Sequence, residues 1–240
     1  MYRPTLEPFT EYSNYAIVIV EPRKHELLKS VIENFDKIMD PKWDLYVFHG
    51  KSYYDYANTC SQNLRRNKYL FPLNSNNLTA DSYNYLFKQK DFWKHVNAEH
   101  ILVFQTDAVL CKDSPFKIED FLKYDYIGCP YDNTYIRKEG RMIWGSDHDF
   151  YGIGGLSYRN KSFMIKCIDT IETTDTFPED VYYSNCVEKI GYKPENATIL
   201  NQFCSQYHGF EKSFGVHKPF HMSNKEDFSK YCPEINILYE

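Results

Sequence analysis

The chain has 240 residues, of which 42% are hydrophobic and 25% are charged, and its formal net charge at pH 7 is -5. These are globular values, and the length suits one large domain or two small ones; we expect one. The 28 basic residues form no long run, which argues against nucleic acid as the main partner, and no stretch reaches the roughly 20 apolar residues that span a bilayer.

The chain begins with an alternation of strand and helix patterns. Residues 15–22 (YAIVIVEP) form a short, β-branched apolar run that stops at a proline, which predicts a buried strand. In residues 23–39 the apolar side chains recur at helical spacing, which predicts an amphipathic helix. Residues 43–50 (WDLYVFHG) predict the second strand.

The next two elements are a short strand and a helix. A third strand is expected at residues 68–73. Residues 77–95 predict a helix that is broken or bent near Asp91, and Thr79 or Asp81 is its candidate N-cap.

The segment 101–110 (ILVFQTDAVL) reads as a buried strand that is interrupted by an acid. Four apolar residues precede Gln105, Thr106 and Asp107, and three more follow. An ionised carboxylate is costly to bury without a partner, so Asp107 is either a turn residue or a ligand.

Strands that alternate with helices in this way predict an α/β fold with a largely parallel sheet. Ligands of such sheets bind outside the carboxyl ends of the strands, so the polar residues at those ends share one crevice. The residues concerned are Glu21, Pro22, Arg23, His49, Gly50 and Asp107.

The second half of the chain is less regular. A strand is expected within residues 121–131, and residues 132–151 read as a long binding or lid loop. Residues 152–160 contain three glycines before a further strand, and helices are expected at 160–171 and 178–191.

The seven cysteines are widely spaced and form no C-x-x-C pair, so we expect reduced thiols and a cytoplasmic protein. The glycines at 152–155 match neither a dinucleotide fingerprint nor a P-loop, and a tight turn is their simpler explanation. The DHD sequence at 147–149 predicts a solvated charge cluster rather than a metal site.

Two pairs of residues are candidates for chemistry. Asp107 and the late His217 offer the oxygen and imidazole ligands that suit Mn²⁺ or Mg²⁺ bound partly by phosphates. Glu179 and Asp180 open a predicted helix, where they are either catalytic carboxylates or first-turn acids that complement the helix dipole.

Five motifs occur in a recognisable order: QTD, YDYIGCP, GIGGLSYR, PEDVYYS and FGVHKPF. With the opening VIVEPR and the FHG strand end, this order resembles a family of uncharacterised domains that are similar to GT-A-fold glycosyltransferases. The resemblance covers roughly residues 15–220. In GT-A enzymes a DxD-type acid binds the metal that clamps the donor diphosphate, and QTD keeps the last of those acids, Asp107.

The resemblance also implies roles for the acids of PEDV. GGLS followed by PEDV is similar to the GGAG and EDV motifs of inverting galactosyltransferases of the core-1 and Fringe type. There the aspartate of the acidic motif is the general base, which implies Asp180 as the base and Glu179 as the second choice. The glycines Gly154 and Gly155 would let the backbone approach the donor sugar closely.

The last motif, GVHKPF, is similar to the terminal G-x-x-K-P-W of glycogenin-like transferases, whose lysine meets the diphosphate. This implies that Lys218 binds the diphosphate. The metal histidine of those enzymes lies three residues before the glycine, where this chain has Lys212, so His217 is its replacement by hypothesis.

Together these inferences predict one GT-A-like (Rossmann-like) domain over residues 1–240, with its core at about 15–220. We expect an inverting transfer of a sugar from a nucleotide sugar to a hydroxyl of a glycan, protein or small molecule, aided by Mn²⁺ or Mg²⁺. The alternatives are a retaining transferase and a catalytically silent nucleotide- or sugar-binding module. The residues expected to bind the donor are Glu21, Arg23, His49, Asn84, Gln105, Thr106, Asp107, Gly154, Gly155 and Lys218, with Asp107 and His217 as metal ligands and Asp180 and Glu179 as catalytic acids.

Overall fold

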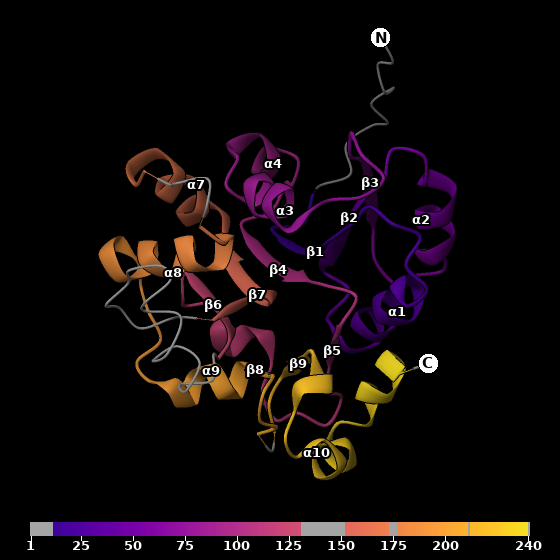
Figure 1. Cartoon of the computed structure of the whole chain (residues 1–240), viewed down its shortest axis with the longest axis vertical. Helices are drawn as coiled ribbons and strands as arrows, with labels where there is room; N and C mark the ends of the chain where they lie inside the picture. The colour runs from indigo at the N-terminus through magenta and orange to yellow at the C-terminus, as the bar shows by residue number, and fades with distance from the viewer. Residues whose placement is uncertain (1–11, 131–151, 173–176, 211, 240) are drawn as a thin grey trace.

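The computed structural model describes residues 12–130, 152–172, 177–210 and 212–239. Its centre is a six-stranded sheet in the order β3-β2-β1-β4-β7-β6 (Figure 1). The pairs from β3 to β4 are parallel, whereas β7 runs antiparallel to both of its neighbours, so the sheet is mostly parallel as predicted. The strands are β1 (Tyr15–Glu21), β2 (Trp43–His49), β3 (Lys68–Pro72), β4 (His100–Phe104), β6 (Tyr126–Cys129) and β7 (Ile153–Asn160).

Both faces of the central sheet are covered by helices, and side chains that alternate along each strand pack against both layers. On β1, Ile17 and Ile19 pack on the side of α1 and α2, whereas Ala16, Val18 and Val20 pack against α3, α4, α7 and α8 (Figure 1). The helices are α1 (Leu28–Ile38), α2 (Tyr54–Cys60), α3 (Ala80–Phe87), α4 (Lys90–Lys94), α7 (Lys161–Thr170), α8 (Glu179–Ile190), α9 (Ala197–Phe203) and α10 (Lys225–Tyr231). The 3-10 segments are Ile118–Phe121, Pro219–His221 and Pro233–Tyr239.

Most of the predicted elements in the first half are confirmed, with shifted ends. The three strands appear as β1, β2 and β3, but the helix predicted from residue 23 begins only at Leu28. The helix predicted over 77–95 is two helices, and their break at Lys88–Gln89 precedes Asp91. Thr79 is the N-cap, since its side-chain oxygen accepts the Ser82 amide at 3.2 Å.

The second half differs more from expectation. The glycines at 152–155 do not form a turn before the strand, because two of them, Gly154 and Gly155, lie within β7. The helices expected at 160–171 and 178–191 are confirmed as α7 and α8. The predicted long loop and its DHD sequence lie outside the described residues.

A second, smaller sheet was not predicted. It has the order β5-β9-β8, with β5 (Ala108–Leu110), β9 (Gly215–His217) and β8 (Cys204–Ser205). The interruption at Asp107 is therefore a change of sheet: the chain leaves β4, turns with the Ala108 amide donating to the Gln105 carbonyl at 3.1 Å, and enters β5. On its free edge β5 is held by Asn34 of α1, whose side chain makes two hydrogen bonds to the Leu110 backbone, at 2.8 and 3.1 Å.

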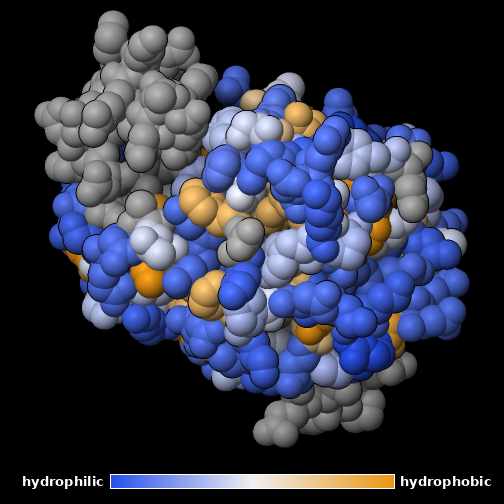
Figure 2. Space-filling view, turned by 90° about the horizontal axis from the view of Figure 1, so that it is seen from below, coloured by the Kyte–Doolittle hydropathy of each residue, from blue (hydrophilic) through white to orange (hydrophobic). Residues whose placement is uncertain are grey.

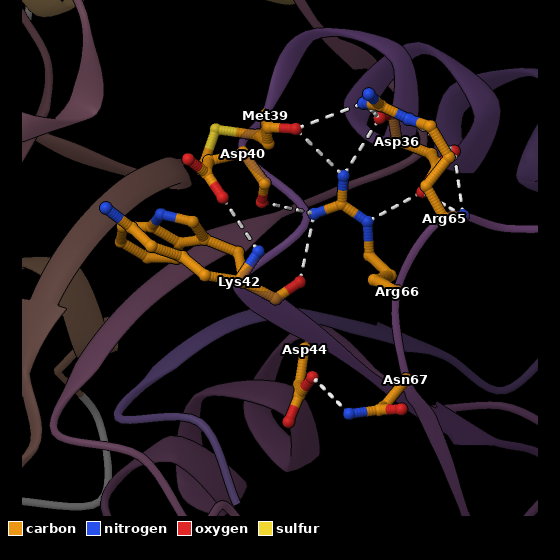
Figure 3. Close-up of polar contacts among 9 residues, drawn as sticks. Asp36, Met39, Asp40, Lys42, Asp44, Arg65, Arg66 and Asn67 are labelled. Atoms are coloured by element: carbon orange, nitrogen blue, oxygen red, sulfur yellow. Dashed lines mark hydrogen bonds and ion pairs between the residues drawn. The ribbon is translucent and has the colours of Figure 1, made fainter.

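A buried arginine, Arg66, binds the C-terminal end of α1 (Figure 3). Arg66 donates to the carboxylate of Asp36 at 2.7 Å and to the carbonyl oxygens of Asp36, Met39 and Trp43 at 2.9–3.1 Å. The carbonyls of Asp36 and Met39 lie at the end of α1, so the guanidinium both caps the helix and complements the negative end of its dipole. The bond to Trp43 also ties this end of α1 to the start of β2.

The prediction of reduced thiols is wrong, because four cysteines form two disulfides. Cys111, after β5, pairs with Cys232 at the end of α10, and Cys129 of β6 pairs with Cys204 of β8, with Cα atoms 5.0 and 4.6 Å apart. Sequence spacing could not reveal these pairs, because the partners are 121 and 75 residues apart. The thiol argument for a cytoplasmic location therefore no longer holds.

The surface seen from below the view of Figure 1 is mostly hydrophilic, with small and separate apolar areas (Figure 2). Among the described residues, every helix is too short or too polar to cross a bilayer.

Candidate active site

One cavity of about 350 Å³ lies where the carboxyl ends of β1 and β4 meet the start of β7 and the small sheet. All of the residues predicted for the site line it, except His49. The further lining residues are Val20, Pro22, Asn77, Leu78, Thr79, Ala80, Tyr83 and Ile153.

His49 was predicted to bind the donor, but it does not line the cavity. It ends β2 beside Glu21 of β1, yet only 2% of it is exposed. Its Nδ1 contacts the carbonyl of Gly50 at 2.9 Å, and its ring meets Tyr54 edge-on. Position at a strand end placed His49 correctly along the sheet, but burial beneath the following loop keeps it from the cavity.

Asp107 and His217 are brought together by the small sheet. Ala108 of β5 pairs with His217 of β9, so the residue before β5 faces the end of β9. The Asp107 Oδ1 and His217 Nε2 atoms lie 3.2 Å apart. They are close enough for an ion pair but misaligned for a hydrogen bond, and each of the two buried atoms has no hydrogen-bond partner.

This pair fits two neighbouring ligands of a divalent cation. Metal ligands lie about 2.0–2.2 Å from such a cation, so two of them at a right angle are about 3 Å apart. Within the described residues, no group of three or more His, Cys, Asp and Glu side chains could hold a metal. A cation at Asp107 and His217 would therefore take its other ligands from water or from phosphate oxygens, as Mg²⁺ commonly does.

Basic groups surround Asp107. Burial raises the pKa of its carboxyl, but His217 and Lys218 lower it by more, so the pKa lies below its ordinary value. Lys218 has a left-handed backbone (φ 48°), and its amide donates to the Asp107 carbonyl at 2.9 Å. Such a backbone is uncommon for a side chain with a Cβ, and here it holds the lysine against the cavity. Lys212, which corresponds to the metal histidine of glycogenin-like transferases, is exposed and does not line the cavity.

Arg23, which also lines the cavity, is held by a buried acid. Its guanidinium donates two hydrogen bonds of 2.8 Å to the carboxylate of Glu21, and its amide donates a third at 3.0 Å. Only 5% of the Glu21 side chain is exposed, against 56% for Arg23. Glu21 is thus a support for Arg23, and the arginine is the member of the pair that a ligand can reach.

Glu179 is engaged by a fully buried arginine. Arg159 of β7 donates to both of its carboxylate oxygens, at 2.7 and 2.9 Å. The guanidinium also lies over the rings of Phe87, Tyr126 and Tyr183, at 4.7–5.8 Å from their centroids. Both carboxylate oxygens of Glu179 are thus occupied by Arg159, and the residue is buried.

Arg159→Met is expected to lower the free energy of unfolding by about 3–5 kcal/mol, because it leaves the Glu179 carboxylate buried without its partner. Urea unfolding at pH 7 measures the change. Lys94→Met is the matched control: it removes the exposed ion pair with Asp91 and should change stability little. Equal effects of the two substitutions would contradict a stabilising role of the buried pair.

Asp180 is the partly exposed acid at the start of α8. Its Oδ2 accepts the Gly154 amide at 3.3 Å, and its Oδ1 accepts the amide of Val181 at 2.8 Å. Burial and the neighbouring charge of Glu179 raise its pKa to about 7. A carboxyl with this pKa is a stronger base than an ordinary aspartate and is still ionised in part at neutral pH.

The two glycines of β7 leave space for two other site residues. A Cβ on Gly154 would collide with the carboxylate of Glu179, and a Cβ on Gly155 would collide with the imidazole of His217. Both glycines also line the cavity, as predicted for residues that a donor approaches.

Sequence reasoning missed three residues that shape the site. Arg159 lies inside an apolar strand pattern, which gave no sign that its charge is paired. Tyr83, on α3, lines the cavity, and burial raises the pKa of its hydroxyl. Gln206 contacts His217 from behind the cavity. Only Tyr83 had a readable signal, since it lies one helical turn after the predicted cap at Thr79.

The architecture of sheet, switch into a small sheet and cavity at the strand ends is that of the GT-A glycosyltransferase fold. The galactosyltransferase LgtC, solved with donor and acceptor sugar analogues, is similar over 91% of this chain and 95% of its own, with a TM-score of 0.54 and 12% identity. The mannosyltransferase PcManGT from Pyrobaculum calidifontis, solved with GDP-Man and Mn²⁺, matches 75% of this chain and 53% of its own, with a TM-score of 0.50 and 11% identity. The glycosyltransferase GlyE of Streptococcus pneumoniae matches 94% and 63%, with a TM-score of 0.50 and 13% identity.

At these identities the likeness shows the fold. The chain belongs to the family described as "Protein of unknown function (DUF5672)", whose model matches residues 70–217. That span runs from β3 to the end of β9 and includes Asp107, Asp180 and His217. No curated protein matches the chain.

Proposed function

We propose that this protein is a glycosyltransferase that moves a sugar from a nucleotide-sugar donor to an acceptor hydroxyl, with inversion and with Mn²⁺ or Mg²⁺. One observation carries the proposal. A single cavity is lined by the acid Asp180, in the first turn of α8, and by the Asp107–His217 pair with Lys218, at the small sheet. An inverting transfer needs this separation, because the base acts on the acceptor while positive charge meets the leaving diphosphate on the other side.

The residues would act as follows. Asp180 takes the proton of the acceptor hydroxyl. At the same time the acceptor oxygen bonds to the anomeric carbon, and the bond from that carbon to the diphosphate breaks. The ammonium of Lys218 neutralises charge on the departing diphosphate. A cation held by Asp107 and His217 would supply Lewis-acid stabilisation of the same leaving group. Arg23, fixed by Glu21, would add a second positive charge for binding of the donor.

We further propose that residues 1–240 form one such domain with its core at about 15–220. The similarity to LgtC supports this extent, since it covers 91% of the chain. The family match covers a smaller part, residues 70–217, which includes Asp107, Asp180 and His217.

Binding of a nucleotide sugar is the first test of the function. A ligand that binds only the folded state stabilises it by about 2.7 kcal/mol at 100 times its Kd, so the melting temperature should rise with the correct nucleoside diphosphate in the presence of Mn²⁺. Nuclear magnetic resonance of the product then compares its anomer with that of the donor. A product that keeps the anomeric configuration of the donor would indicate a retaining transferase. A protein that binds the donor but neither transfers its sugar nor hydrolyses it would be a catalytically silent binding module.

Lys218→Ala is expected to weaken binding of the nucleoside diphosphate roughly 10–150-fold, which corresponds to the 1.5–3 kcal/mol of a well-formed charge-assisted contact. The nucleoside without phosphates should bind the variant and the wild type alike. Calorimetric titration with both ligands measures the difference.

Lys212→Ala is the matched control, because Lys212 has the same left-handed backbone (φ 74°) but lies outside the cavity. If both ligands lose affinity equally in Lys218→Ala, or if Lys212→Ala behaves in the same way, Lys218 has a structural role only.

A further inference from the structure

Gln206 is a buried amide directly behind the cavity, and no motif of the sequence selects it. It follows β8 and is 3% exposed. Its Oε1 lies 2.8 Å from Nδ1 of His217. The opposite ring nitrogen, Nε2, is the atom that faces Asp107.

The orientation of the Gln206 amide selects the tautomer of His217. With Oε1 toward the ring, Nδ1 is the protonated nitrogen of neutral His217, because an amide oxygen can only accept. Nε2 is then a bare acceptor that lies 3.2 Å from a carboxylate oxygen, and neither buried atom has a hydrogen-bond partner. Two unpartnered acceptors facing each other are unfavourable until a cation lies between them.

We propose that Gln206 is a positioning residue that holds His217 as the Nδ1–H tautomer and thereby presents Nε2 as a metal ligand. The inference rests on the proposed function only in assigning a divalent cation to this pair. A hydrogen bond from the second ring nitrogen to an acceptor commonly orients a metal-binding histidine and raises its basicity.

The surroundings hold Gln206 in this position. Ser205, the preceding residue, pairs with Val216 of β9, one residue before His217. Cys204 is tied to β6 by its disulfide with Cys129. The imidazole therefore lies on β9, and the amide directly follows the neighbouring strand β8, which is covalently anchored to the central sheet.

The proton position is measured directly on the wild-type protein without metal. In protein labelled with ¹⁵N-histidine at pH 8, the ¹⁵N shifts distinguish a protonated ring nitrogen from a bare one, and the loss of signals in His217→Gln assigns the residue. We expect a protonated Nδ1 and a bare Nε2. A protonated Nε2 would overturn the proposal, because the ring would then donate to Asp107 and the amide would donate to Nδ1.

Metal affinity is the second measurement, and it needs neither donor nor acceptor. Mn²⁺ alone is titrated and the free ion is counted by electron paramagnetic resonance. Gln206→Met keeps the length of the side chain but removes the acceptor, and should weaken Mn²⁺ binding roughly 10–100-fold. Gln206→Glu keeps an acceptor oxygen and should retain the affinity.

Ser205→Ala is the matched control. The substitution removes the buried hydrogen bonds of the Ser205 hydroxyl with Ser213 and with the Phe210 amide. It leaves the contact between Gln206 and His217, so the Mn²⁺ affinity of the variant should equal that of the wild type. Equal affinities of Gln206→Met and the wild type, including the case in which neither binds Mn²⁺, would overturn the proposal. Absence of sugar transfer with the expected tautomer and affinities would count against the proposed function alone.

Discussion

Asp180→Asn is expected to lower the rate of sugar transfer roughly 10²–10⁴-fold, because the amide cannot accept the proton of the acceptor hydroxyl. Donor affinity should hardly change, since Asp180 is assigned to the acceptor, whereas the diphosphate is assigned to Lys218 and the Asp107–His217 pair. Asparagine still accepts one of the two amides, from Gly154 and Val181, that the carboxylate accepts now. Initial rates and donor titrations of the same preparations give the two quantities.

Glu179→Gln is the neighbouring variant for comparison. Its main effect should be on stability, because it removes the charge that balances Arg159 in a buried site. A rate loss confined to Glu179→Gln, with wild-type turnover in Asp180→Asn, would reverse the assignment of the base and remove the main support for inversion.

The raised pKa of Asp180 has two consequences for pH dependence. The active form is the carboxylate, so the transfer rate should rise as pH passes about 7 and then level off. For stability the sign is the opposite. The folded state binds this proton more tightly than the unfolded chain, whose aspartate titrates near 3.9, so the contribution is complete below about pH 4 and is lost as pH rises through about 7.

The neutral Asp180→Asn protein does not lose that contribution. Its melting temperature should match that of the wild type near pH 4 and exceed it at pH 8. A variant that is equally or less stable at pH 8 would show that burial does not oppose the charge of Asp180, whatever its effect on the rate.

The sequence predicted those features that depend on local pattern. Apolar runs bounded by Pro or Gly located β1 and β2, and the parallel arrangement of strands explains why Glu21, Arg23 and Asp107 meet at one edge. The order of the motifs brought Asp180, His217 and Lys218 into the same site before any contact was visible. Each of these residues lines the cavity.

The parts that were not predicted depend on contacts between distant segments. Strands of two or three residues, such as Cys204–Ser205 and Gly215–His217, are too short to show a period of two, so the small sheet gave no signal. A residue such as Gln206 becomes functional only through its partner on another strand. The sequence also could not show that Gly154 and Gly155 are in close contact with Glu179 and His217, which come from distant segments.

The proposed metal ligands Asp107 and His217 can be tested directly, and with them the reason why an acid stands between two apolar runs. Asp107→Asn is expected to weaken Mn²⁺-dependent binding of a nucleoside diphosphate more than roughly 100-fold, since even indirect partners of metal ligands commonly change metal affinity 10–100-fold. Binding of the same nucleoside without phosphates should be unaffected. Calorimetric titrations with and without Mn²⁺ separate these contributions.

The substitution also distinguishes a metal ligand from a turn residue. The turn before β5 uses backbone groups: the Ala108 amide donates to the Gln105 carbonyl, and the Lys218 amide donates to the Asp107 carbonyl. Asparagine preserves both bonds, so a turn residue would tolerate it with unchanged diphosphate affinity. His217→Gln should cause a similar loss, and the double variant should lose little more than either single one, because two ligands of one cation act as a unit and their effects are not additive. Fully additive losses would mean that Asp107 and His217 serve separate purposes, and the shared cation would have to be abandoned.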